Sequence, residues 1–95
     1  MIEIKILNKA GSFAENKDSA RDIRINKIIP ALEKNEEVIL NFEGIEGTTQ
    51  SFIHALISDI IRKYGVGALD KISFKNCNET VKKIISIVAD YMQES

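Results

Sequence analysis

Hydroxyl side chains are concentrated in one short stretch of the chain, Thr48-Thr49-Gln50-Ser51, which stands between a glycine-containing loop and an apolar helical pattern. Hydroxyl oxygens at the start of a helix accept hydrogen bonds from backbone amides that have no partner inside the helix. The same amides, together with the helix dipole, favour an anion such as a regulatory phosphate. These residues therefore predict either a capping segment alone or a hydroxyl-rich platform that a partner recognises.

Candidate catalytic groups are few in this sequence. His54 stands one position away from an apolar stripe, beside Ser58 and Arg62, which is typical of a histidine on a solvated helix face. Cys77 is interpreted as an incidental thiol, because the chain has no second histidine that could act as its base. The sequence contains no glycine-rich phosphate loop, dinucleotide fingerprint or nucleophile elbow. We therefore predict no catalytic residue, no cofactor and no metal site.

The composition is that of a small domain with balanced charge. Ninety-five residues are enough for a single domain, 1–95, with one core. Its 13 basic and 14 acidic side chains give a net charge of -1, which argues against nucleic acid or a membrane surface as a partner. No apolar run is long enough to span a bilayer, no signal-peptide pattern opens the chain, and the single Cys77 cannot form an internal disulfide. We therefore expect a reduced, cytoplasmic protein.

Segments with strand periodicity alternate with segments of helical periodicity. The strand patterns cover residues 1–7, 37–42 and 69–74, with a further short strand expected near Ser12 to Ala14, and the helical patterns cover residues 20–32, 52–64 and 81–92. The continuous apolar run in 37–42 favours a strand that is covered on both faces. Strands that alternate with helices form right-handed βαβ units. The sequence therefore predicts an α/β domain with a central mixed sheet of about four strands flanked by helices.

Several polar residues are candidates for helix ends. The pair Asp18-Ser19 could accept from the first amides of the first helix, and Asn76 or Asn78 could do so for the last one. Pro30 lacks an amide donor and predicts a kink or a break, and Asn35 is expected to end that helix. One contiguous core is expected from the apolar side chains of Leu56, Ile57, Ile60, Val81, Ile84, Ile85, Val38 and Leu40.

Three segments carry a resemblance to a known family: Leu40-Asn-Phe-Glu-Gly-Ile45, Gln50-Ser51-Phe52 and Phe74-Lys-Asn-Cys-Asn78. In order and spacing they resemble the bacterial STAS-like domains, which are relatives of the STAS domains of anti-sigma-factor antagonists. The resemblance extends from about Gly11 to Tyr91. It implies a four-stranded sheet flanked by helices, and a protein that switches partners rather than turning over a substrate. It also implies a histidine-kinase-type ATPase as the partner.

The resemblance is weakest at the site of phosphorylation. In STAS antagonists the loop before the corresponding helix reads Asp-Ser-Ser/Thr-Gly, and a partner kinase phosphorylates its first hydroxyl residue. When the two are aligned on the preceding strand, Thr49 takes the place of Asp, Gln50 that of the acceptor, Ser51 the next place and Phe52 that of Gly. Gln50 cannot carry a phosphate ester. Ser51, Thr49 or Thr48 would have to substitute for it, or the switch is absent.

These observations favour a non-catalytic regulatory module that binds another protein. Its predicted surface consists of Thr48, Thr49, Gln50, Ser51, His54, Ser58 and Arg62. The first alternative is a constitutive assembly module, for example a homodimer, without phosphate control. The second is a small enzyme or small-molecule site at the carboxyl ends of the strands, built from Glu43, Glu46, His54 and Cys77.

Overall fold

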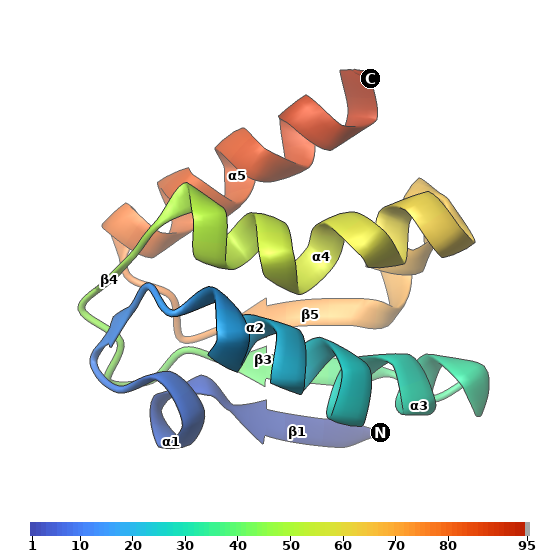
Figure 1. Cartoon of the computed structure of the whole chain (residues 1–95), viewed down its shortest axis with the longest axis horizontal. Helices are drawn as coiled ribbons and strands as arrows, with labels where there is room; N and C mark the ends of the chain where they lie inside the picture. The colour runs from blue at the N-terminus through green and yellow to red at the C-terminus, as the bar shows by residue number, and fades with distance from the viewer. Residues whose placement is uncertain (95) are drawn as a thin grey trace.

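The computed structural model of this chain describes residues 1–94, in which strands and helices alternate (Figure 1). In chain order the elements are β1 (Ile2–Lys5), α1 (Ile6–Ala10), β2 (Phe13–Ala14), α2 (Lys17–Ile23), the π-helical segment η1 (Arg24–Ile28), α3 (Ile29–Glu33), β3 (Val38–Asn41), β4 (Gly47–Thr48), α4 (Gln50–Tyr64), the 3₁₀ segment η2 (Val66–Lys71), β5 (Ile72–Lys75) and α5 (Glu79–Glu94). Two strand boundaries differ from the predictions by two residues or more. The first strand ends at Lys5, because Ile6 already begins α1, and the last strand begins only at Ile72, after η2.

The strands form two separate parallel sheets. In the larger one β3 lies between β1 and β5, with Ile2 and Ile72 in register with Val38 on either side. The smaller sheet pairs β2 with β4 and places Ala14 beside Thr48. The predicted single mixed sheet of about four strands is therefore wrong, although the short strand expected near Ser12 is present as β2. The reason is α1, which turns the chain away from the end of β1 before β2 begins.

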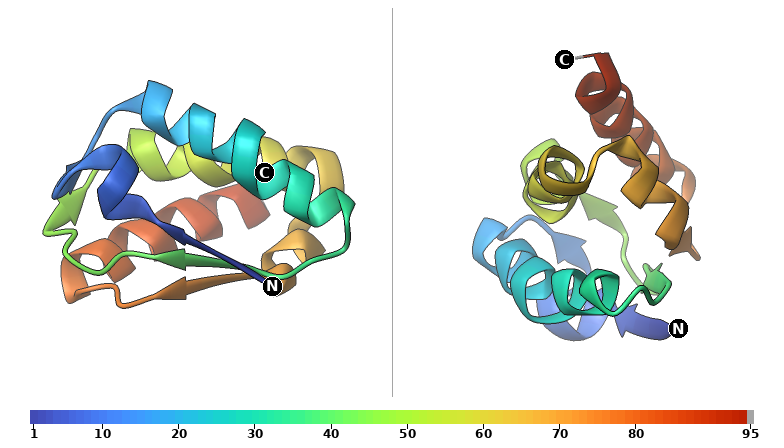
Figure 2. Two further views of the ribbon diagram at one scale, coloured as in Figure 1. Left: turned by 90° about the horizontal axis from the view of Figure 1, so that it is seen from below. Right: turned by 90° about the vertical axis from the view of Figure 1, so that its right-hand side faces the viewer.

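The helices cover one face of the larger sheet and leave the other face open. Figure 2 shows α2, α4 and α5 on the same side of β1, β3 and β5. On the far side Glu3, Lys5, Ser73 and Lys75 are exposed, and Ile39 between them is only half-buried. The expectation that β3 is covered on both faces is therefore wrong. The strand order β1-β3-β5 follows the chain, so successive right-handed crossovers pass over the same face.

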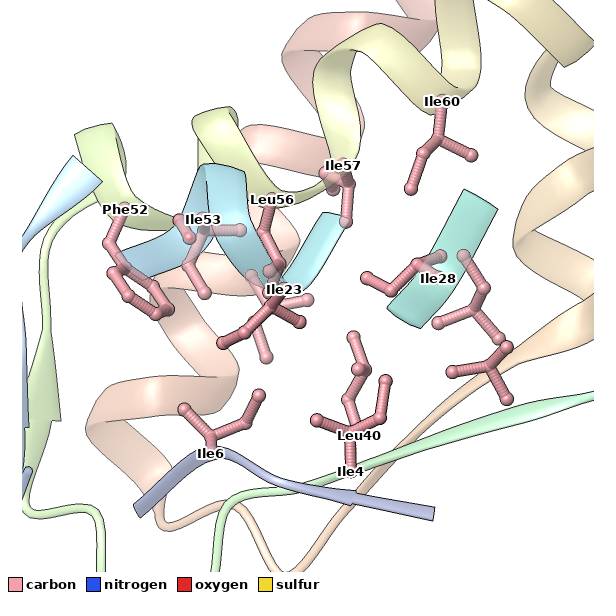
Figure 3. Packing of buried hydrophobic residues seen from close by; sticks show 14 of the residues in the cluster. Ile4, Ile6, Ile23, Ile28, Leu40, Phe52, Ile53, Leu56, Ile57 and Ile60 are labelled. Atoms are coloured by element: carbon pink, nitrogen blue, oxygen red, sulfur yellow. The ribbon is translucent and has the colours of Figure 1, made fainter. Parts of the chain in front are cut away.

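The core lies between the covered face of the sheet and the helices. Figure 3 shows Ile4 and Leu40 of the sheet below Ile23 and Leu56 of the helices. The predicted core is confirmed, except that Ile84 is half-buried at its edge. Helix α4 packs against α2 on one side and α5 on the other, so it is buried over a wide arc. This arrangement fixes which side chains of α4 can reach solvent.

One continuous helix, residues 17–33, comprises α2, η1 and α3. Its N-cap is Asn16 rather than Asp18 or Ser19, because Asn16 Oδ1 accepts from the amides of Asp18 at 2.8 Å and of Ser19 at 3.3 Å. The helix does not break at Pro30. It widens instead into the π-helical turns of η1, just before the position where Pro30 cannot donate a hydrogen bond.

The end of this helix lies where the sequence predicts it. Asn35 has a left-handed backbone with φ of 61°. Its amide donates to the carbonyl of Leu32 at 2.9 Å, and the amide of Glu36 donates to the carbonyl of Ala31 at 2.9 Å. These two bonds form a Schellman motif, which satisfies carbonyls of the last turn and directs the chain into β3.

Candidate functional site

The smaller sheet fixes the hydroxyl stretch at the start of α4. Thr48 lies in β4 and is buried, and its Oγ1 donates to the carbonyl oxygen of Ala14 at 2.7 Å. The same carbonyl accepts from the amide of Thr49 at 3.2 Å. Thr48 is therefore a structural residue and is not exposed on the predicted partner surface. The alternation of a strand directs its side chain inward, whereas the sequence suggested a loop at this point.

Thr49 is the residue that caps α4. Its backbone is extended, and its Oγ1 accepts from the amide of Phe52 at 3.1 Å. Gln50 and Ser51 then form the first turn of the helix, and both side chains are exposed. Thr48 and Thr49 therefore hold the segment in place, and Ser51 is its exposed hydroxyl residue.

Replacing Thr49 with alanine is expected to lower the free energy of unfolding by about 1 kcal/mol, because the amide of Phe52 loses its acceptor. Aspartate at the same position can still accept from that amide, and its charge is favourable at a helix N-terminus. Thr49→Asp should therefore retain most of the stability. Urea denaturation of both variants measures the difference. Equal stability of Thr49→Ala and the wild type would show that the cap contributes nothing.

An asparagine holds the loop before α4 against α5. The amide group of Asn78 donates to the carbonyl oxygens of Ile45 at 3.3 Å and of Glu46 at 3.0 Å. Its Oδ1 accepts from the amide of Val81 at 2.8 Å, so the same side chain caps α5. Asn78, and not Asn76, is therefore the cap of the last helix. One side chain thus joins the loop to the helix that faces it.

A second asparagine organises the carboxyl end of the larger sheet. Asn41 is buried in β3, and its amide group donates to Glu3 Oε2 at 2.8 Å. Its Oδ1 accepts from the amide of Glu43 and from Asn76 Nδ2, both at 2.9 Å. Asn76 has a left-handed backbone with φ of 59°, which a β-branched side chain would not tolerate. This network was not apparent from the sequence, because its members lie far apart in the chain.

A surface hollow of about 450 Å³ lies between the first half of α4 and the second half of α5. It is lined by Lys17, Gln50, Ser51, His54, Ala55, Ile87, Val88 and Tyr91. Three of the predicted site residues, Gln50, Ser51 and His54, therefore lie together on one wall. The opposite wall is apolar and includes Tyr91, of which 63% is exposed.

The remaining predicted residues of α4 lie outside this hollow. Ser58 is 3% exposed, so its assignment to the exposed helix face is wrong. The reason is the wide buried arc of α4, which is covered by α2 as well as by α5. Arg62 is exposed near the other end of the helix, where its guanidinium contacts Asp59 Oδ1 at 3.1 Å. Asp59 also pairs with Arg24 at 3.3 Å, so this end of α4 is occupied by ion pairs.

Of the groups considered for catalysis, Glu43 and Glu46 lie between β3 and β4, and His54 lies in α4. Cys77 lies between β5 and α5, and burial raises the pKa of its thiol, an effect that the Lys82 ammonium partly offsets. Only His54 among these candidate catalytic groups lines the hollow. Residues 1–94 contain no group of three histidine, cysteine or acidic side chains that could hold a metal ion. In the same part of the chain no helix is both long and apolar enough to cross a membrane.

A family model described as a STAS-like domain of unknown function matches residues 19–82. The chain belongs to this family of STAS-like domains. The resemblance inferred from the sequence is thus confirmed, and the matched segment contains β3, β4, α4 and β5. Comparisons with curated proteins and with solved structures gave no match. Membership in the STAS-like family indicates a regulatory or interaction domain.

Proposed function

We propose that this STAS-like domain is a non-catalytic regulatory module that binds another protein at the hollow beside the start of α4. The observation that carries the proposal is the composition of the hollow. Polar side chains of Gln50, Ser51 and His54 face an apolar wall with the largely exposed Tyr91. Protein interfaces commonly combine an aromatic anchor with hydrogen-bonding groups around it.

The proposed regulation is a change of charge at Ser51. This side chain is exposed at the second residue of α4, and the first turn of the helix contains no acidic residue. A phosphate would add nearly two negative charges at this point. The helix tolerates them, because its N-terminus favours an anion. A partner packed over Ser51 would have to desolvate the charges, which weakens the complex.

The proposed partner is a histidine-kinase-type ATPase in the cytoplasm. Support for this part comes from the family: the chain belongs to the STAS-like domains, and the resemblance drawn from the sequence implies such an ATPase as the partner. The test is to place the photoreactive amino acid p-benzoylphenylalanine at Gln50 in living cells, with Asp70 in η2 as the control position. Illumination should link a specific ATPase to the Gln50 protein and not to the Asp70 protein, both of which are expected to fold because both positions are exposed.

Ser51→Asp is expected to weaken binding of the captured partner by about tenfold or more, which corresponds to at least about 1.4 kcal/mol. Ser51→Ala should bind nearly as well as the wild type, because it removes a hydroxyl without adding a charge. Ser73→Asp is a matched control, since Ser73 is exposed on the open face of the sheet, away from the hollow. Calorimetric titration of the folded proteins measures the three affinities.

The same titrations distinguish the proposed charge switch from the first alternative, a constitutive assembly module. If Ser51→Asp and Thr49→Asp both bind as tightly as the wild type, charge does not control the interaction. The domain would then be a constitutive assembly module. If illumination links nothing at Gln50, the hollow is not the partner surface.

A further inference from the structure

Helix α5 carries two apolar seams. The inner seam consists of Val81, Ile85, Val88 and Met92, which are buried in the core. The outer seam consists of Ile84, Ile87 and Tyr91. Its spacings of three and four residues are those of a coiled-coil seam, which repeats every 3.5 residues. The apolar arc of α5 is therefore wider than its contact with the core requires.

The outer seam becomes more exposed toward the end of the helix. Ile84 is half-buried, Ile87 is 41% exposed and Tyr91 is 63% exposed. The second half of α5 lies at the margin of the domain (Figures 1 and 2), where its inner side is buried through Val88 and Met92 and its outer side is exposed. Both Ile87 and Tyr91 belong to the exposed large apolar side chains of the described residues. Contiguous apolar surface of this kind is characteristic of an interaction site.

Two opposite charges, seven positions apart in the sequence, flank the outer seam. Lys83 precedes Ile84, and Asp90 precedes Tyr91, so both charges lie on the same flank of the helix. Seven residues separate them by about 10 Å along the axis, which is too far for an ion pair. Neither charge is in any ion pair formed within the described part of the chain. Both are exposed and therefore available to another molecule.

We propose that a second copy of this chain covers the outer seam, with the two α5 helices antiparallel and a twofold axis near Ile87. In this arrangement Ile84 packs against Tyr91 of the other copy, and Lys83 lies beside its Asp90. The symmetry forms each contact twice, because an isologous interface is self-complementary. In a parallel pair the same flank of the two helices would lie on opposite sides of the interface, so Lys83 and Asp90 of the two copies would not meet.

The pairing has a consequence for the hollow beside α4. Ile87 and Tyr91 belong both to the outer seam and to the apolar wall of the hollow. A second copy on the seam would therefore stand over the hollow and exclude another protein from it. The evidence for the pairing, which is the seam and its charges, does not depend on the proposed function.

Exchange of the two charges tests the pairing. Sedimentation equilibrium of the full chain should show a dimer. Lys83→Glu or Asp90→Lys alone should weaken dimerisation by about tenfold or more, because each variant puts like charges in contact at both symmetry-related positions. The double variant Lys83→Glu/Asp90→Lys should restore the wild-type dissociation constant. Lys82→Glu is the control, since Lys82 carries the same charge on a different flank and contacts Glu79 at 3.9 Å. It should leave the dimer unchanged.

A cross-link near the axis identifies the surface directly. Cysteine is introduced at Ile87 in a Cys77→Ser background, and a short bismaleimide should join two copies. The same cysteine at Ser73, on the open face of the sheet, should not be joined. A wild-type protein that stays monomeric at several hundred micromolar overturns the proposal. So does a dimer that is neither weakened by the single charge reversals nor cross-linked at Ile87, because it must use another surface.

Discussion

Replacing Ile60 with alanine is expected to lower the free energy of unfolding by about 2–5 kcal/mol. Ile60 is fully buried in α4, and Figure 3 shows its side chain directed into the core above Ile28. Truncation removes three methyl or methylene groups and leaves a cavity that the close-packed neighbours cannot fill. For a domain of this size the loss is a large fraction of the total stability, which is about 5–15 kcal/mol in typical proteins.

The matched control for this prediction is Ile25→Ala. Ile25 is the same residue type in a helical segment but is 44% exposed, so its truncation should cost less than about 1 kcal/mol. Guanidinium or urea denaturation of the two variants gives the difference directly. A change below about 0.5 kcal/mol for Ile60→Ala would mean that this face of α4 does not pack against the sheet.

The helices of the core could be predicted because apolar residues recur in their sequence at the spacing of a buried helix face. Leu56, Ile57 and Ile60 recur at the spacing of one helix face, and the structure buries all three. Ile84 departs from the prediction because it lies where the inner seam of α5 meets the outer seam. A stripe indicates which residues are apolar, but the neighbouring elements decide how far the burial extends.

The arrangement of the strands could not be predicted in the same way. β2 and β4 have two residues each, too few for any periodicity. They are defined by the pairing of Ala14 with Thr48, which stand 34 positions apart in the chain and are joined by a hydrogen bond. The open face of the larger sheet was missed because the apolar run of β3 includes Ile39, which occupies that face among polar neighbours. Which face the helices cover is a property of the connections rather than of the strand itself.

At the candidate site, the sequence indicated the segment but not the role of each hydroxyl. Thr48 and Thr49 are the same residue type, yet one lies in β4 and the other caps α4, because the helix begins at Gln50. Ser58 was misassigned because α4 is covered from two sides, which a stripe does not reveal. Tyr91 was missed because it is exposed although the pattern suggested burial. It continues an apolar helical pattern, but its side chain lies on the outer side of α5 and is 63% exposed.

The sequence indicated Asn78 only as a candidate cap, and its bonds to the loop before α4 were beyond it; together these contacts lead to a second large effect. Asn78→Ala is expected to lower the free energy of unfolding by about 2–3 kcal/mol. The substitution removes the cap on the amide of Val81 and both hydrogen bonds to the carbonyls of Ile45 and Glu46. Denaturation measures the total effect. Hydrogen exchange divides it between the helix and the loop.

Asn78→Asp separates the two contributions. Aspartate still accepts from the amide of Val81 and is favoured by the helix dipole, but it cannot donate to the carbonyls of Ile45 and Glu46. The amides of Glu46 and Thr49, which bond to Ser12 and Ala14, should therefore exchange faster in both variants. The amide of Val81 should exchange faster only in Asn78→Ala. If Glu46 and Thr49 stay protected in Asn78→Asp, the pairing of β2 with β4 alone holds the start of α4, and Asn78 serves only as the cap of α5.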